Sequence, residues 1–224
     1  MIRKFDPHAV PIRTVADLLE RLGDIPPERV IMTPSPGTAT EEDVLRLLGN
    51  PTRKVRAELI DGTLVEKHMG WLESVVAGCL IQQLRNFISA LNLGVVSVPD
   101  GAYRMISGNI RFPDIAFVPW TSIPEDMTAH EKIADLPPVL AVEILSDSNT
   151  PKEIATKLAE YFARGCKLAW VIDPATETAT AHTSAKRGRA IPADGELTGG
   201  KVLPGFALKL SDLFAATKRP PKKK

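Results

Sequence analysis

The spacing of apolar residues along the chain predicts one long helix and a series of short strands. The helix runs from Trp71 to Leu91, where apolar side chains recur roughly every three to four positions, and Asn92 to Gly94 ends it. Asp61 and Gly62 stand between alternating apolar residues, which is typical of a β-hairpin. The predicted buried stripe of the helix is Leu72, Val75, Val76, Cys79, Leu80, Leu84, Phe87 and Leu91. Further apolar runs of strand length lie at residues 57–65, 95–98, 102–106, 112–118, 139–145 and 168–172.

A second helix separates two of these strands, 139–145 and 168–172. It begins at Pro151, after a capping box formed by Thr150 and Glu153, and continues to Arg164. Nearly continuous apolar strands on either side of a helix indicate a parallel pair that is covered on both faces. The remaining strands, at residues 176–183 and 202–208, are predicted to close the sheet as an antiparallel pair. We therefore predict an α/β fold with a mixed sheet.

The first 50 residues have a different character from the rest of the chain. They contain two short helical patterns, at residues 14–22 and 40–49, joined by a proline-rich stretch. Such short elements are too small to form a second core. We predict an N-terminal helical appendage and linker at 1–50, one main domain at 51–216 and a basic, disordered tail at 217–224.

Charge is distributed unevenly along a chain of otherwise ordinary composition, with 44% hydrophobic and 25% charged residues. Residues 218–224 carry five of the 28 basic side chains, so the remaining 23 face 27 acidic ones, a net charge of −4. The body is therefore not a basic shell of the kind that covers DNA. The tail either steers phosphate groups by charge or is simply a solvated terminus.

The chain has neither an apolar stretch long enough to span a membrane nor a start of signal-peptide type. Its two cysteines, Cys79 and Cys166, lie in helix and strand patterns and are interpreted as reduced core thiols. We expect a cytoplasmic protein.

Two carboxylates interrupt apolar strands, which indicates a metal-binding or catalytic site. Asp114 lies within the strand at 112–118, Glu143 lies within the strand at 139–145, and Lys157 follows on the next helix. Burying an unpaired carboxylate is costly, so such groups are usually paired or bound to metal. If the two strands are neighbours, the carboxylates converge as Mg²⁺ ligands, and the metal would activate a water. Lys157 would orient that water or stabilise the developing charge, and Glu58 is a possible extra carboxylate at the rim.

Each of these residues also has a simpler structural explanation. Asp114 follows a proline and fits a turn or cap, and Glu58 fits an ordinary acid on a strand surface. Lys157 and Tyr161, four positions apart, fit one solvated helix face equally well. Glu143 is harder to explain in this way, because six apolar residues flank it. The combination is therefore a stronger indication than any member alone.

Four motifs, in this order and spacing, resemble the Uma-two family of restriction-endonuclease-like proteins over roughly residues 40 to 210. They are ELIDG at 58–62, PDIAFV at 113–118, VEILS at 142–146 and WVIDP at 170–174. Through this family the chain is similar to the PD-(D/E)XK nuclease superfamily, which implies a restriction-endonuclease-like central mixed β-sheet flanked by helices.

The resemblance also implies roles for individual residues. Asp114 and Glu143 would be metal ligands, and Glu58 would match the upstream acidic position. The superfamily lysine usually stands two residues after the glutamate, where this chain has Leu145. Lys157, on the following helix, is the candidate replacement. The family's histidine at the start of the long helix has no clean match, since Glu73 occupies about that place.

These observations lead to two alternative functions. The first is a Mg²⁺- or Mn²⁺-dependent endonuclease that hydrolyses the phosphodiester bonds of double-stranded DNA and acts as a homodimer. The second is a catalytically inactive nucleic-acid-binding or protein-interaction module that keeps the same fold. The acidic body favours the second somewhat, because a DNA cleft should carry positive charge.

Overall fold

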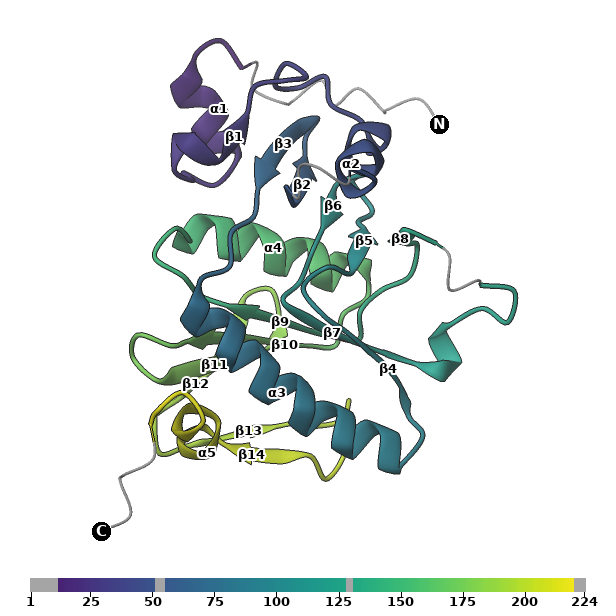
Figure 1. Cartoon of the computed structure of the whole chain (residues 1–224), viewed down its shortest axis with the longest axis vertical. Helices are drawn as coiled ribbons and strands as arrows, with labels where there is room; N and C mark the ends of the chain where they lie inside the picture. Colours follow the sequence, from purple (N-terminus) through teal and green to yellow (C-terminus); the bar gives the residue numbers. More distant parts are fainter. Residues whose placement is uncertain (1–11, 51–54, 128–130, 220–224) are drawn as a thin grey trace.

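Two six-stranded β-sheets lie on opposite sides of the helix α4 (Pro151–Arg164). In this computed structural model, residues 12–50, 55–127 and 131–219 are described. Figure 1 shows one sheet above α4 and the other below it, and we call them the upper and lower sheets. The predicted mixed α/β class is confirmed, with the strands divided between two sheets.

The lower sheet carries the strand pair that the sequence predicts to be parallel. Its strands, in spatial order, are β12 (Arg187–Ile191), β11 (Thr178–Ser184), β10 (Leu168–Asp173), β9 (Leu140–Ile144), β7 (Ile115–Pro119) and β4 (Gly94–Ser97). β9 and β10 are parallel, with Val142 opposite Trp170, and α4 is the crossover between them. Because successive strand residues face opposite sides, Val142 faces the lower core while Glu143 faces α4.

The upper sheet is built from shorter strands that precede and follow the long helix in the chain. In spatial order they are β1 (Val30–Ile31), β3 (Thr63–Glu66), β2 (Ala57–Ile60), β6 (Ile110–Arg111), β5 (Ala102–Arg104) and β8 (Ile133–Ala134). β2 and β3 form the predicted hairpin, and Asp61 and Gly62 at its turn both have positive φ. The run predicted as one strand at 112–118 instead begins as β7 at Ile115, so Asp114 lies just before a strand.

The main apolar core lies beneath the lower sheet. There α3 (Trp71–Ala90) packs with α5 (Leu210–Ala215) and a small sheet of β13 (Glu196–Thr198) and β14 (Ala207–Lys209). Val76, Leu80 and Leu84 of the predicted stripe are buried, but Leu72 and Leu91, near its two ends, are 40% and 55% exposed. The predicted stripe is therefore buried at Val76, Leu80 and Leu84 and exposed at Leu72 and Leu91.

The predicted pairing of the last strands is wrong. β11 pairs with β12, and β14 pairs with β13, so the segments at 176–183 and 202–208 are not partners. Short connections explain the difference, because closing a hairpin between neighbouring segments costs less chain entropy than joining distant ones.

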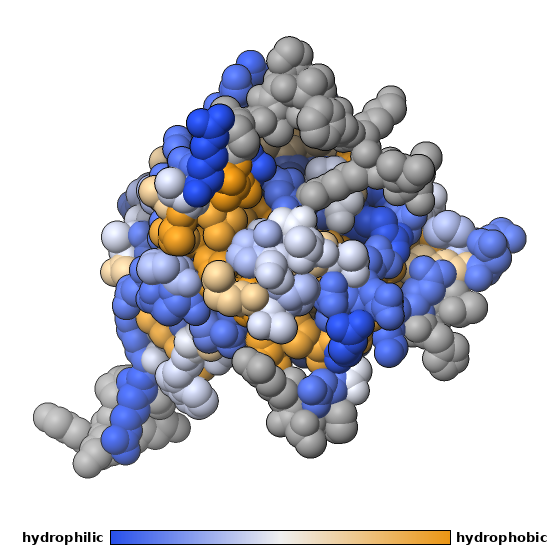
Figure 2. Space-filling view, turned by 90° about the horizontal axis from the view of Figure 1, so that it is seen from above, coloured by the Kyte–Doolittle hydropathy of each residue, from blue (hydrophilic) through white to orange (hydrophobic). Residues whose placement is uncertain are grey.

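The N-terminal segment packs on the upper sheet and contributes its edge strand, β1. Leu18 and Leu22, from and just after α1 (Val15–Arg21), pack against Ile60 and Val65. The segment continues through the 3₁₀ turn η1 (Pro27–Arg29) to α2 (Glu41–Leu48), which packs on the same sheet. Seen from above, this end of the molecule shows hydrophobic patches among hydrophilic residues (Figure 2).

Two further sequence predictions concern the ends and the membrane. The predicted basic tail lies largely outside the described residues, although Lys218 is described and pairs with Glu177. Among the helices of the described ranges, none combines the length and apolar character that crossing a membrane would require.

Candidate active site

Asp114 and Glu143 lie opposite each other at one end of an antiparallel strand pair. β7 and β9 pair with Ile115 opposite Val142, and the two acids come one residue before and one residue after these positions. Asp114 Oδ2 accepts a hydrogen bond of 2.7 Å from the backbone N–H of Ile144. The two residues are only 3% and 4% exposed. The strand register therefore brings two buried carboxylates together.

Lys67, which directly follows β3 of the upper sheet, lies between these two carboxylates. Its ammonium nitrogen is 2.9 Å from Asp114 Oδ1 and 3.9 Å from Glu143 Oε2. The same ammonium donates a hydrogen bond to the carbonyl oxygen of Phe112. Asp114 Oδ1 and Glu143 Oε2 thus face one shared cation.

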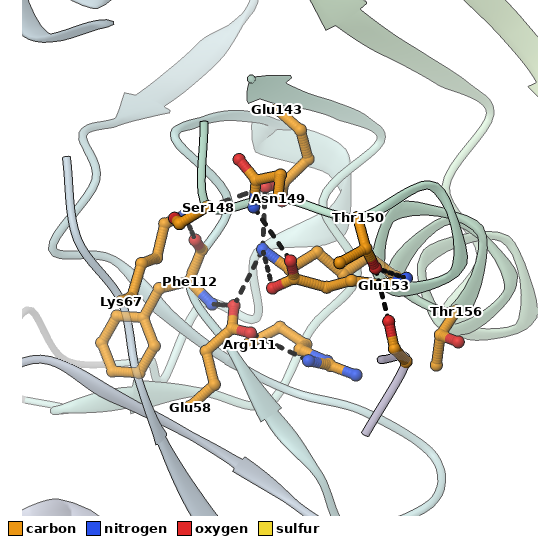
Figure 3. Close-up of polar contacts among 12 residues, drawn as sticks. Glu58, Lys67, Arg111, Phe112, Glu143, Ser148, Asn149, Thr150, Glu153 and Thr156 are labelled. Atoms are coloured by element: carbon orange, nitrogen blue, oxygen red, sulfur yellow. Dashed lines mark hydrogen bonds and ion pairs between the residues drawn. The ribbon is translucent and has the colours of Figure 1, made fainter. Parts of the chain in front are cut away.

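Lys157 occupies the buried side of the same group of charges. Its ammonium is 2.9 Å from Glu143 Oε2, 3.4 Å from Glu58 Oε1 and 4.0 Å from Glu153 Oε1, and Figure 3 shows these three carboxylates converging. Tyr161, one turn further along α4, donates a 2.5 Å hydrogen bond to Glu143 Oε1. Lys157 and Tyr161 are 1% and 0% exposed. The alternative of a solvated helix face is therefore wrong.

Glu58 is completely buried, in contrast to the strand-surface acid that its local sequence suggests. Its Oε2 accepts a 2.8 Å hydrogen bond from Arg111, and its Oε1 accepts one of 3.3 Å from the backbone N–H of Phe112. Burial is the largest influence and raises the pKa of Glu58, but Lys157, Arg111 and Lys67 together lower it below the usual value. Glu58 is therefore an anion that balances buried cations.

Burial and the neighbouring lysines or carboxylates have opposite effects on the pKa values of Glu143 and Lys157, whereas burial and charge act together at Tyr161. At Glu143, burial is the largest influence and, helped by Asp114 and Glu58, raises the pKa despite the two lysines. At Lys157, burial lowers the pKa, but the surrounding carboxylates outweigh it and raise the pKa above its usual value. Burial, followed by the charge of Glu143, raises the pKa of Tyr161, so its phenol stays protonated and donates.

An outer layer of contacts ties the N-terminal segment to this site. Arg29 is 3% exposed, and its two terminal nitrogens lie 3.0 and 2.7 Å from the carboxylate oxygens of Glu153. Asn149 donates a further 3.0 Å hydrogen bond to Glu153, and Arg29 also donates to the carbonyl of Ser148. Glu153 thus links Arg29 to Lys157, and Figure 3 shows it beside Asn149 and the start of α4.

A narrow pocket of about 10 Å³ opens beside the two carboxylates, and Lys67, His68, Met69 and Glu73 are among its lining residues. Within the described ranges, no cluster of three or more His, Cys, Asp or Glu side chains is arranged to hold a metal ion. Mg²⁺, however, is commonly held by one or two carboxylates together with waters and phosphate oxygens. Because Asp114 and Glu143 already share an ammonium, their oxygens fit a hard divalent cation.

The four residues singled out from the sequence lie in one charge cluster. Lys157 contacts both Glu58 and Glu143, and Asp114 lies across Lys67 from Glu143. Sequence reasoning missed other members of the cluster, namely Arg29, Lys67, Arg111 and Glu153. Arg111 carried a usable signal, since it opens a buried apolar run, whereas Lys67 stands among polar residues and gave none.

Comparison with known proteins shows the family to which the chain belongs. The sequence matches the family model Uma2, described as "Putative restriction endonuclease", over residues 41–211. The chain belongs to the Uma2 family. The resemblance inferred from the four motifs is therefore confirmed. No protein matches in a search of curated sequences.

A solved structure supports the fold of this Uma2 member. It is the crystal structure titled as a "putative nuclease belonging to DUF820" from Anabaena variabilis ATCC 29413. The two chains are 18% identical, the match covers 77% of this chain and 97% of that one, and the TM-score is 0.67. At this identity the likeness shows a shared fold.

Proposed function

We propose that this Uma2 protein is a metal-dependent endonuclease that hydrolyses phosphodiester bonds of DNA. The observation that carries the proposal is the pair of buried carboxylates, Asp114 and Glu143, that face one cation at the edge of a pocket. The family description and the nuclease title of the structural relative point to the same chemistry. Asp114 and Glu143 would hold Mg²⁺ or Mn²⁺, which supplies an activated water and neutralises charge on the scissile phosphate.

The surrounding residues hold these two ligands in place. The backbone N–H of Ile144 fixes Asp114, while Lys157 and Tyr161 each donate to one oxygen of Glu143. Hydrogen-bond partners that fix the orientation of ligand carboxylates strengthen metal binding. We assign Lys157 the further role of offering positive charge at the floor of the pocket, which it lines.

Glu58 acts behind Lys157 in this proposal. It balances the charges of Lys157 and Arg111, which would otherwise repel a cation at the neighbouring carboxylates. In the reaction itself, the water oxygen forms a bond to phosphorus, the ester P–O bond breaks, and the departing oxygen takes up a proton. Glu58 thus lowers the net positive charge beside the metal site and does not contact the phosphate.

The restriction-endonuclease-like family suggests that the substrate is double-stranded DNA. We propose that a homodimer cuts it. The narrow pocket admits only a small group, so the duplex would lie across its mouth near His68 and Glu73. The rival is a module that binds nucleic acid or protein without cutting. The excess of acidic residues in the body supports that rival.

Nicking of supercoiled plasmid DNA with Mn²⁺ tests the proposal. We expect the wild type to nick, and Asp114→Asn to lose at least about 100-fold in rate, because one metal-binding charge is removed. Asp194→Asn, at an exposed turn before β13, is the matched control and should nick like the wild type.

Three outcomes separate the alternatives. Equal nicking by the wild type and Asp114→Asn would show that the activity comes from another site or from a contaminant. Binding of the plasmid by the wild type with no metal-dependent nicking would favour the inactive module. Loss of nicking in Asp114→Asn alone, with unchanged folding by circular dichroism, would support the endonuclease.

A further inference from the structure

We infer that Lys67 is a built-in cation that a divalent metal must displace in order to bind at Asp114 and Glu143. This inference rests on the proposed metal site and adds to it a competitor from the chain itself. Lys67 comes from the upper sheet, whereas both carboxylates come from the lower sheet. A single side chain therefore links the two sheets through the place where the metal would lie.

The contacts of Lys67 are those of an ion held between two ligands. Its ammonium lies 2.9 Å from Asp114 Oδ1 and 3.9 Å from Glu143 Oε2, and its third contact is the backbone carbonyl of Phe112. All three partners are oxygens, the donor type that hard divalent cations also take. The other oxygens of the two carboxylates are engaged by Ile144 and Tyr161. Lys67 contacts the remaining two oxygens, Asp114 Oδ1 and Glu143 Oε2, the second of which also accepts a 2.9 Å hydrogen bond from Lys157. A metal bound by this pair would therefore take the place that the Lys67 ammonium now occupies.

Space and charge both prevent the ammonium and a metal from occupying the site together. The pocket beside the carboxylates measures about 10 Å³, which is close to the smallest space that holds one water. The four cations of the cluster already match its four most buried carboxylates. A divalent ion would add two positive charges close to the ammonium, and their repulsion would drive Lys67 out.

Lys67, unlike Lys157, has the freedom to leave. Its side chain is 8% exposed and lines the pocket, and the side chain of the next residue, His68, is 58% exposed, so Lys67 lies on the solvent side of the cluster. Lys157 is 1% exposed and lies among three carboxylates. A lysine side chain is also long and flexible, which suits a group that moves by rotating its own bonds.

Titration calorimetry with Mn²⁺, and with Ca²⁺ as a second cation, measures the competition directly in the whole chain. We expect Lys67→Met to bind metal at least about tenfold more tightly than the wild type, because the competing charge is gone. Lys67→Arg keeps the charge and should show no such tightening. Lys152→Met removes a lysine that is 45% exposed on α4, and it should bind metal like the wild type.

A second measurement covers the case in which Lys67→Met folds poorly without metal. Its melting temperature should be below that of the wild type in metal-free buffer and should rise more on addition of Mn²⁺, because metal replaces the lost cation. Lys67→Gln, which keeps a hydrogen-bond donor, should show the same change in a milder form.

The outcomes distinguish this inference from the proposal on which it rests. Equal or weaker metal binding by Lys67→Met, with metal binding by the wild type that Asp114→Asn abolishes, would overturn the inference and leave the metal site intact. Metal binding that Asp114→Asn leaves unchanged, or no binding by any variant, would overturn the metal site and the inference together.

Discussion

Glu58 shows how a single buried charge depends on its neighbours. It is fully buried, and without partners it would be protonated or would destabilise the fold. Arg111 and Lys157 lie 2.8 and 3.4 Å from its two oxygens and lower its pKa against the effect of burial. The ionised form of Glu58 therefore stabilises the folded state at neutral pH.

Glu58→Gln tests this contribution through its pH dependence. The folded pKa is below the unfolded value, so the stabilisation is present above about pH 4.3 and is lost as the pH falls toward the folded pKa. We expect the variant to lose about 3 kcal/mol of unfolding free energy at pH 7. The difference in unfolding free energy between the wild type and the variant should narrow as the pH falls below about 4. The wild type loses the contribution of ionised Glu58 in acid, whereas the variant has no such contribution to lose.

Urea unfolding from pH 7 to pH 3 measures this gap. Glu20→Gln is the control, because the Glu20 side chain is 76% exposed, and it should change stability by no more than about 0.5 kcal/mol. A gap that stays constant or widens in acid would show that Glu58 is not held as an anion by these cations.

Individual residues differ in how far the sequence could reveal them. Asp114 and Glu143 were visible because each interrupts an apolar run, and burial gives such an interruption a cost. Lys67 lies between Glu66 and His68 and becomes buried only when the two sheets come together. Arg29 stands in a proline-rich stretch and is buried by contact with Glu153, which is 124 positions away in the chain. Such contacts depend on tertiary packing, which local patterns do not contain.

At the scale of elements, the N-terminal segment packs closely against the start of α4. Gly23 has a φ of +93°, and a Cβ atom there would lie 2.8 Å from the backbone of Glu153. The hydroxyl of Thr150 donates to the carbonyl of Gly23, next to the point where α4 begins. This contact brings Arg29 to Glu153 and, through Glu153, supports Lys157.

Gly23→Ala tests that contact, with Gly37→Ala as a matched control. Both glycines have positive φ, so alanine costs about 1–2 kcal/mol at either position. Only Gly23 has a close neighbour, since a Cβ at Gly37 would meet nothing within 4 Å. We expect Gly23→Ala to lose a further 1–3 kcal/mol, roughly, through overpacking. Equal losses in urea unfolding would show that the segment does not pack tightly on α4.

The elements with strong local signals were predicted well. Capping residues located the starts of α1, α2 and α4, and the Asp61–Gly62 turn located the first hairpin. The pairing of the last strands was wrong, because apolar runs do not specify partners. The division into two sheets was also not predictable, since it depends on which strand edges meet in space.

At the scale of the whole molecule, the site lies where two sheets and one helix meet. The lower sheet supplies Asp114 and Glu143, the upper sheet supplies Glu58, and α4 supplies Lys157 (Figure 1). The charge cluster therefore forms only when both sheets and α4 are in place. The proposed homodimer and cytoplasmic location stay predictions, as does the division of the chain into an appendage, a domain and a tail.

A crystal soaked in Mn²⁺ shows directly whether Asp114 and Glu143 form a metal site. Anomalous scattering should place one Mn²⁺ ion at about 2.0–2.3 Å from Asp114 Oδ1 and Glu143 Oε2, a usual length for bonds from oxygen to small divalent ions. The Lys67 ammonium should have left the space between them. No anomalous peak at this pair in a fully soaked crystal, with Lys67 still bridging the two carboxylates, would show that Asp114 and Glu143 do not form a metal site.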